Sequence, residues 1–125
     1  MSANEPTQVI EVFAKLFNSG DMDGLMDTLY EDDVVLVPGP GAEVAKGKDA
    51  ARAVLQEFLN LGGTITIEAA AAYEMGDIAL THSKWKLDVP GADAMTGTTA
   101  EIVRRQPDGS WKYVVDNPWG GAVLS

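Results

Sequence analysis

Two acidic residues, Glu101 and Asp116, lie in segments with the alternating pattern of β-strands, and their carboxyl groups are suited to acid–base chemistry. The segments 98–106 and 110–116 flank a Pro-Asp-Gly turn, a pattern that predicts a β-hairpin. A carboxylate inside a strand is disfavoured unless it reaches water, a partner or a cavity, so the hairpin points to a pocket. Where two carboxyls share a partly apolar pocket, one pKa rises while the other group stays ionised, which supplies an acid and a base.

Each of these acids also has a purely structural interpretation. Glu101 could form an ion pair with Arg105 or Lys112, and Asp116 could cap the turn that follows it. The single histidine, His82, lies in a predicted strand. It is a candidate general base if its side chain points into the pocket, and otherwise a surface residue or a core residue with satisfied hydrogen bonds.

The composition excludes several classes of function. At 125 residues the chain forms one domain, residues 1–125, which is large enough for a single core. Its net charge of -10 disfavours nucleic acid and anionic membrane surfaces as partners. The absence of cysteine excludes disulfides and thiolate catalysis, and with one histidine we expect no metal and no other cofactor. The first residues lack the pattern of a leader, and no apolar run could span a bilayer, so we expect a cytoplasmic protein.

Helical periodicity precedes strand alternation along the chain, and this order predicts an α+β fold with helices packed on one face of an antiparallel sheet. Asn4 is the expected N-cap of the first helix and Asp21 that of the second; the spacing after Asp21 does not fit a calcium loop. The alanine run at 69–72 is assigned to a strand because strand-forming residues precede it and a glycine turn follows. The helices are expected at 5–18, 21–30 and 48–61, and the strands at 34–37, 64–74, 78–87, 98–106 and 110–116.

Five short motifs follow one another along residues 5–120, and their order and spacing resemble one known superfamily. They are Phe17-Asn18-Ser19-Gly20-Asp21, Leu29-Tyr30-Glu31-Asp32-Asp33, Lys46-Gly47-Lys48-Asp49-Ala50, Gly76-Asp77-Ile78-Ala79-Leu80 and Gln106-Pro107-Asp108-Gly109-Ser110-Trp111-Lys112. The chain resembles the nuclear transport factor two-like superfamily, also called the cystatin-like cone fold, and within it the SnoaL-like group of small bacterial proteins. The resemblance implies three helices on a curved, mostly antiparallel sheet that encloses a cone-shaped pocket. It does not imply one activity, because this fold hosts isomerases, cyclases, dehydratases, epoxide hydrolases and non-catalytic modules.

Ketosteroid isomerase has the same layout, and its functional groups can be compared with this sequence position by position. That enzyme moves a proton with a base and holds the resulting enolate with a tyrosine and a protonated carboxylic acid. The resemblance places Glu101 at the acid donor, Phe13 at the tyrosine and Pro38 near the base. It also places Asp116 on the pocket side of the neighbouring strand. Ketosteroid isomerase activity is therefore not expected, but a pair of carboxyls in the pocket is.

Aromatic residues are the expected walls of this pocket. Phe13, Phe17, Tyr30, Trp85 and Trp119 could line its mouth and stack on a flat ligand, although aromatics at such spacing are also ordinary core residues. Trp119 follows the last predicted strand, where a tail can fold over a pocket. The expected partner is a small apolar ligand. An isomerase, cyclase or hydrolase would act on a carbonyl or polyketide-like compound; the alternative is a ligand carrier or sensor, or a dimerisation module.

The two faces of the predicted hairpin suggest different roles. Alternation assigns Val103 to the face of Glu101, and so to the pocket. On the last strand, Trp111, Tyr113 and Val115 share the other face, which no predicted helix covers. Such an apolar face is usually an interface, and the superfamily commonly dimerises sheet to sheet, so we expect a homodimer there. The alternative is scattered exposure of apolar side chains, as on any protein surface.

Overall fold

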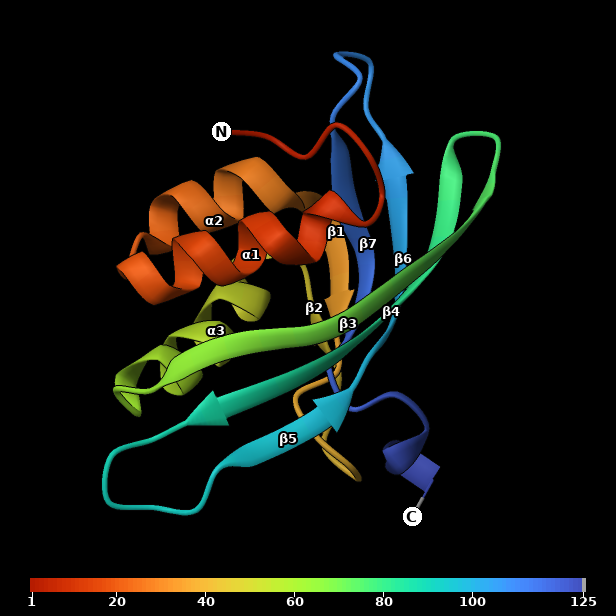
Figure 1. The fold of residues 1–125 in the computed structure, drawn as a ribbon. Coiled ribbons are helices and arrows are strands. Elements are labelled where there is room, and N and C mark those ends of the chain that lie inside the picture. The colour runs from red at the N-terminus through yellow and green to blue at the C-terminus, as the bar shows by residue number, and fades with distance from the viewer. Residues whose placement is uncertain (125) are drawn as a thin grey trace.

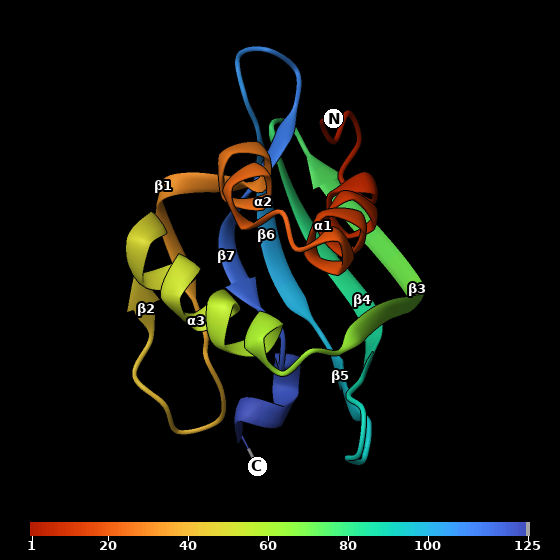
Figure 2. The same ribbon diagram turned by 90° about the vertical axis from the view of Figure 1, so that its left-hand side faces the viewer.

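Over residues 1–124, which this computed structural model describes, three α-helices lie on one side of a seven-stranded sheet (Figures 1 and 2). The helices are α1 (Gln8–Ser19), α2 (Met22–Leu29) and α3 (Lys48–Asn60). Helix α1 begins later than predicted, with Thr7 and not Asn4 at its N-cap, because the main-chain N–H of Gln8 closes a turn onto the carbonyl of Glu5 at 3.0 Å. The three helices packed on one side of the sheet confirm the predicted α+β fold.

The sheet is mixed and mostly antiparallel. Its strands are β1 (Tyr30–Leu36), β2 (Ala45–Lys46), β3 (Thr64–Met75), β4 (Ile78–Asp88), β5 (Met95–Thr98), β6 (Ala100–Arg105) and β7 (Trp111–Asn117). They are ordered β2-β1-β7-β6-β4-β3, with β5 paired to β4; β1 and β7 run parallel and the other described pairs are antiparallel. A short 3-10 helix, η1 (Gly120–Leu124), follows β7. β1 is longer than predicted and starts directly after α2, whereas the alanine run of β3 pairs with β4 as predicted.

Two polar side chains, those of Asn18 and Asp21, fix the chain between α1, α2 and β3. The Asp21 carboxylate accepts from the main-chain N–H of Gly24 at 2.9 Å, so its role as the cap of α2 is confirmed. The Asn18 amide donates to the carbonyl of Ile65 at 2.9 Å and accepts from the N–H of Ile65 at 2.8 Å. The end of α1 is thereby attached to the start of β3, which runs past α1 in a long curved hairpin with β4 (Figure 1).

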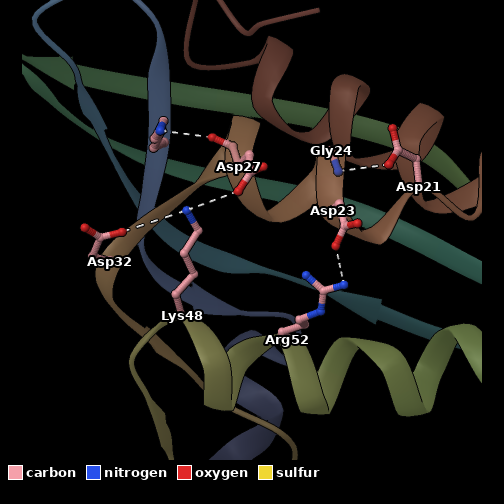
Figure 3. Close-up of polar contacts among 8 residues, drawn as sticks. Asp21, Asp23, Gly24, Asp27, Asp32, Lys48 and Arg52 are labelled. Atoms are coloured by element: carbon pink, nitrogen blue, oxygen red, sulfur yellow. Dashed lines mark hydrogen bonds and ion pairs between the residues drawn. The ribbon is translucent and has the colours of Figure 1, made fainter.

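Ion pairs at the surface connect the start of α3 to its neighbours (Figure 3). The Lys48 Nζ lies 3.7 Å from a carboxylate oxygen of Asp27 and 3.8 Å from one of Asp32. One turn later, Arg52 pairs with Asp23. Exposed pairs of this kind are each worth about 0.2–1 kcal/mol, so they orient α3 over the sheet more than they stabilise it.

A β-bulge at Val114 interrupts the alternation of β7. Ile102 pairs with Val115 and Val103 with Tyr113, so that Val114 is an extra residue with no partner of its own on β6. The side chains on the two sides of a bulge are shifted by one position, and inward-facing residues no longer follow a period of two.

The bulge reverses the predicted assignment of the β7 faces. Trp111 and Tyr113 are 2% and 1% exposed and point into the core, on the same side as Asp116. The prediction that Trp111 and Tyr113 lie on an outer, interface-forming face is therefore wrong. Val115 remains on the outer face, opposite Ile102.

Candidate functional site

A cavity of about 60 Å³ lies between the helices and the inner face of the sheet. Its walls come from α1, α3, five strands of the sheet and the segment after β7, and most of the lining side chains are apolar. No lysine, arginine or histidine of the described chain lines it. The polar side chains that reach it are those of Thr99, Glu101, Tyr113 and Asp116.

Glu101 and Asp116 occupy the same cross-strand pair on β6 and β7, and their side chains are 2% and 4% exposed. Directly opposite residues have Cβ atoms about 4.5–5.5 Å apart, so the two carboxyl groups are neighbours. The Tyr30 hydroxyl donates to Asp116 Oδ2 at 2.6 Å. The hydroxyls of Thr99 and Thr81 donate to Glu101 Oε1 at 2.8 and 3.2 Å.

Burial raises the pKa of both carboxyls, but to different extents. For Asp116, burial raises the pKa to about 6, although hydrogen bonds from Tyr30 and Glu101 lower it. For Glu101, burial and the charge of Asp116 raise the pKa well above its ordinary value, against hydrogen bonds from two threonines and Tyr113. Two coupled carboxyls release their protons in separate steps. The charge of Asp116 raises the pKa of Glu101, whereas the hydrogen bond from Glu101 lowers that of Asp116, so Asp116 ionises first and Glu101 keeps its proton to higher pH. In the state with one proton, the pair combines an acid, Glu101, with a base, Asp116.

The structural alternatives for the two acids do not match their contacts. Arg105 pairs with a surface aspartate at 2.6 Å, and Lys112 donates to a main-chain carbonyl of α2 at 3.1 Å, so neither cation neutralises Glu101. The turn after β7 is capped by Asn117, whose side-chain oxygen accepts two main-chain N–H groups at 3.1 Å each. Asp116 instead points inward.

The predicted pocket residues fall into two groups. Phe13, Phe17 and Trp85 line the cavity. Tyr30 and Val103 are fully buried in the core beside the cavity and do not line it. Tyr30 nevertheless belongs to the site, because its hydroxyl is bound to the carboxylate of the base.

Trp119 packs beside the cavity and fixes the segment after β7. Its ring meets that of Trp85 edge-on, with 5.6 Å between centroids, and lies 6.3 Å from the ring of Phe58. Its indole N–H donates to the carbonyl of Pro38 at 3.0 Å, while the indole N–H of Trp85 donates to the carbonyl of Pro118 at 2.8 Å. Two indole hydrogen bonds thus hold this segment against the end of the cavity where Phe58 lies.

His82 lies on the outer face of β4, away from the two carboxyls. Its side chain is exposed, and its Nδ1 lies 2.8 Å from the main-chain carbonyl oxygen of Thr99. Because a carbonyl oxygen only accepts, Nδ1 must carry the hydrogen. The structure therefore does not bring this predicted residue into the site; His82 satisfies a main-chain group at the junction of β5 and β6.

Sequence reasoning missed three polar members of the site, namely Thr81, Thr99 and Tyr113. The two threonines carried a usable signal, because Thr99 precedes Glu101 by two residues and Thr81 lies at an inward position of β4. No sequence signal pointed to Tyr113, because the bulge that turns its side chain inward has no signature in the sequence.

Within residues 1–124, no three histidine, aspartate or glutamate side chains lie together in a way that could hold a metal ion. None of the helices in this part of the chain is long and apolar enough to cross a membrane.

Comparison with known proteins identifies relatives of the whole fold. The model of the SnoaL-like domain family matches residues 9–114. A nuclear transport factor two-like protein of unknown function from Pseudomonas putida has a TM-score of 0.72 and 23% identity, covering 88% of this chain and 80% of that one. A protein with a cystatin-like fold from Novosphingobium aromaticivorans has a TM-score of 0.70 and 23% identity, covering 95% and 86%. A candidate dehydratase from Streptomyces avermitilis has a TM-score of 0.69 and 18% identity, covering 88% and 91%. None of the curated proteins matches this chain.

Proposed function

Because this chain belongs to the SnoaL-like domain family, we propose that its cavity binds a small, largely apolar molecule and that Glu101 and Asp116 act on that molecule as acid and base. One observation carries the proposal: two buried carboxyls face each other in a cavity whose other walls are mostly apolar. Burying a charge in such surroundings is costly, so a carboxylate placed there needs a reason beyond stability.

The proposed chemistry is proton transfer next to a carbonyl group. Ionised Asp116 takes a proton from the carbon beside the carbonyl, and neutral Glu101 gives its proton to the carbonyl oxygen, which yields an enol. Return of the proton to another carbon gives an isomerisation; attack on a second carbonyl gives a cyclisation. The candidate dehydratase among the structural relatives is in keeping with acid–base chemistry on this fold.

The size of the cavity limits the ligand. At about 60 Å³ it is well below the roughly 150 Å³ of a cavity known to bind benzene. As it stands, the cavity admits a molecule of a few heavy atoms. A polyketide-like compound requires Phe58 and Trp119 to move apart, and these two rings contact each other across 6.3 Å.

The charge of the cavity limits the ligand further. One negative charge remains on the carboxyl pair, and no basic side chain of the described residues lines the cavity to balance it. A second negative charge would therefore be repelled in a medium of low polarity. We propose a neutral carbonyl compound, and not a carboxylate, as the ligand.

The alternative function is a non-catalytic carrier or sensor. Four hydroxyl groups already donate to the two carboxyls, so the polar groups of the site satisfy one another without a ligand. In this case the cavity binds by burial of apolar surface, and the carboxyls contribute little to affinity.

Thermal-shift measurements with small ketones of increasing size, from acetone to cyclohexanone, test the proposed binding. A ligand that binds the native state raises the melting temperature. We expect a rise with a small ketone, a smaller rise or none in Glu101→Gln, and no rise with butyrate. Asp33→Asn, which removes an exposed carboxyl that does not line the cavity, is the control. An equal response of wild type and Glu101→Gln favours the carrier; no response to any compound contradicts the proposal.

We further propose a second copy of the chain as the partner of the outer sheet face, which no α-helix of the described residues covers (Figure 1). Tyr73 pairs with Leu80 and Met75 with Ile78, so these four side chains share one face. They are 65%, 39%, 87% and 43% exposed, in that order, which leaves a large apolar patch in water. Sedimentation of Leu80→Glu should then show a monomer, whereas Leu61→Glu, at an exposed leucine on the helical side, should sediment like the wild type.

A further inference from the structure

The two sides of Glu101 differ in their hydrogen-bonding groups. β6 lies between β4 and β7, so Glu101 has Thr81 directly opposite on one side and Asp116 directly opposite on the other. The hydroxyls of Thr81 and Thr99 both donate to the same oxygen, Oε1, at 3.2 and 2.8 Å. Oε1 is therefore turned toward β4, which leaves Oε2 on the side of β7, where the carboxylate of Asp116 and the hydroxyl of Tyr113, which also hydrogen-bonds Glu101, lie.

Thr99 lies between the end of β5 and the start of β6, and hydrogen bonds to two residues of β4 hold it in this position. Its main-chain N–H donates to the carbonyl of Ser83 at 2.8 Å, and its hydroxyl accepts from the N–H of Ser83 at 2.8 Å. Its carbonyl accepts from His82 on the outer face. The Thr99 hydroxyl also lies 3.2 Å from the hydroxyl of Ser83, but Glu101 Oε1 is nearer, at 2.8 Å, and receives its hydrogen; Ser83 is then the donor in the longer contact.

We propose that Thr81 and Thr99 are positioning residues that fix the transferable proton of Glu101 on Oε2, facing Asp116 and the cavity. An oxygen that accepts two hydroxyl hydrogens has both lone pairs occupied, and it is the carbonyl oxygen of the neutral acid. The hydroxyl of that acid must then be the other oxygen. The two threonines decide from which atom of the acid the proton leaves.

The inference rests on the acid role proposed above for Glu101. When the O–H bond at Oε2 breaks, the proton passes to the carbonyl oxygen of the ligand and a negative charge remains on the carboxylate. The two threonine hydroxyls already point at that carboxylate, so they stabilise its charge without reorganising. A deletion of either hydroxyl should therefore weaken the acid without removing it.

Isotope-edited infrared spectroscopy tests the position of the proton. Neutral Glu101 has a C=O stretching band, which is identified by ¹³C-glutamate labelling and by its loss in Glu101→Gln. Because hydrogen bonds to a carbonyl oxygen weaken the C=O bond, Thr81→Val and Thr99→Val should each shift the band to higher wavenumber. The double variant should shift it furthest. Thr81→Ser and Thr99→Ser keep the hydroxyls and should leave the band at its wild-type position.

A band that stays at its wild-type wavenumber in the valine variants overturns the proposal, because the proton is then not placed by these hydroxyls. Thr99→Val also deprives the N–H of Ser83 of its acceptor. If that variant does not fold, Thr81→Val decides the question, since it leaves the Ser83 contact intact. The band is measured without ligand, so a shifted band together with no ketone binding contradicts the proposed function and leaves the proton placement standing.

Discussion

Replacing Asp116 by asparagine should change how the stability of this protein depends on pH. Burial raises the pKa of Asp116 from 3.8 to about 6, a rise of about two units. Since one unit corresponds to about 1.4 kcal/mol, the folded state gains about 3 kcal/mol from holding this proton at low pH. The side chain is buried, so solvent does not screen this effect away.

The stabilisation that the Asp116 proton provides decreases as the pH rises. The folded pKa lies above the unfolded one, so the folded state binds more protons than the unfolded state between these two values. The contribution of Asp116 to the free energy of unfolding is therefore fully present below the pKa that this group has in the unfolded chain. It is lost as the pH rises through about 6, its pKa in the folded state. Between pH 5 and pH 7 the wild type should lose about 1 kcal/mol of unfolding free energy relative to Asp116→Asn.

Urea denaturation of wild type and Asp116→Asn at several pH values from 5 to 7 measures this difference, above the isoelectric point of 4.3. Asp33→Asn reports the effect of losing one exposed negative charge. Asparagine keeps an oxygen that can accept from Tyr30, so the substitution removes the charge of Asp116 and retains this hydrogen bond. A relative stability that is constant or that rises with pH would show that Asp116 does not titrate as a buried carboxyl, and the assignment of acid and base would then be unfounded.

Three further substitutions test other contacts of the site. Tyr30→Phe removes the hydrogen bond that lowers the pKa of Asp116, so a ¹³C NMR titration should show that pKa rise by about one unit; no rise would mean that the hydroxyl does not bind the carboxylate in solution. In Gly97→Ala the new Cβ would lie 2.8 Å from the ring of Trp85. Urea denaturation should therefore show that the free energy of unfolding falls by about 1–3 kcal/mol, and an unchanged midpoint would contradict this packing. Trp119→Ala should open the cavity, so the thermal shift with cyclohexanone should exceed that of the wild type; an equal shift would show that Trp119 does not limit ligand size.

The helices and most strands were predictable because each carries a local signal. The apolar stripe of α2, Met22, Leu25, Met26 and Leu29, is buried throughout. Asp21 caps this helix through a contact three residues away, which local sequence can specify. The alanine run of β3 needed the flanking residues as evidence, because alanine alone favours a helix.

The site was predictable where strand alternation is regular and not where it is broken. Alternation placed Glu101 and Val103 inward, and both are buried. The bulge at Val114 reverses the phase of the strand, and valine is as acceptable in a bulge as in a regular strand. Tyr113 was therefore assigned to the wrong face. The orientation of His82 depended on the face of β4 that the helices cover, which is a property of the assembled fold.

The parallel pairing of β1 with β7 has a consequence for the order in which this chain folds. Tyr30 and Asp116 are 86 positions apart in the sequence, and their hydrogen bond forms only after that long loop has closed. The β3–β4 hairpin and the helices involve nearby residues and can form early, whereas strand pairs of high sequence separation form slowly. A folding intermediate could therefore have most of its secondary structure, including the β6–β7 hairpin, and still lack both the Tyr30 hydrogen bond to Asp116 and the wall of the cavity that β1 supplies. Recovery of ketone binding during refolding would then lag behind recovery of the far-ultraviolet circular dichroism.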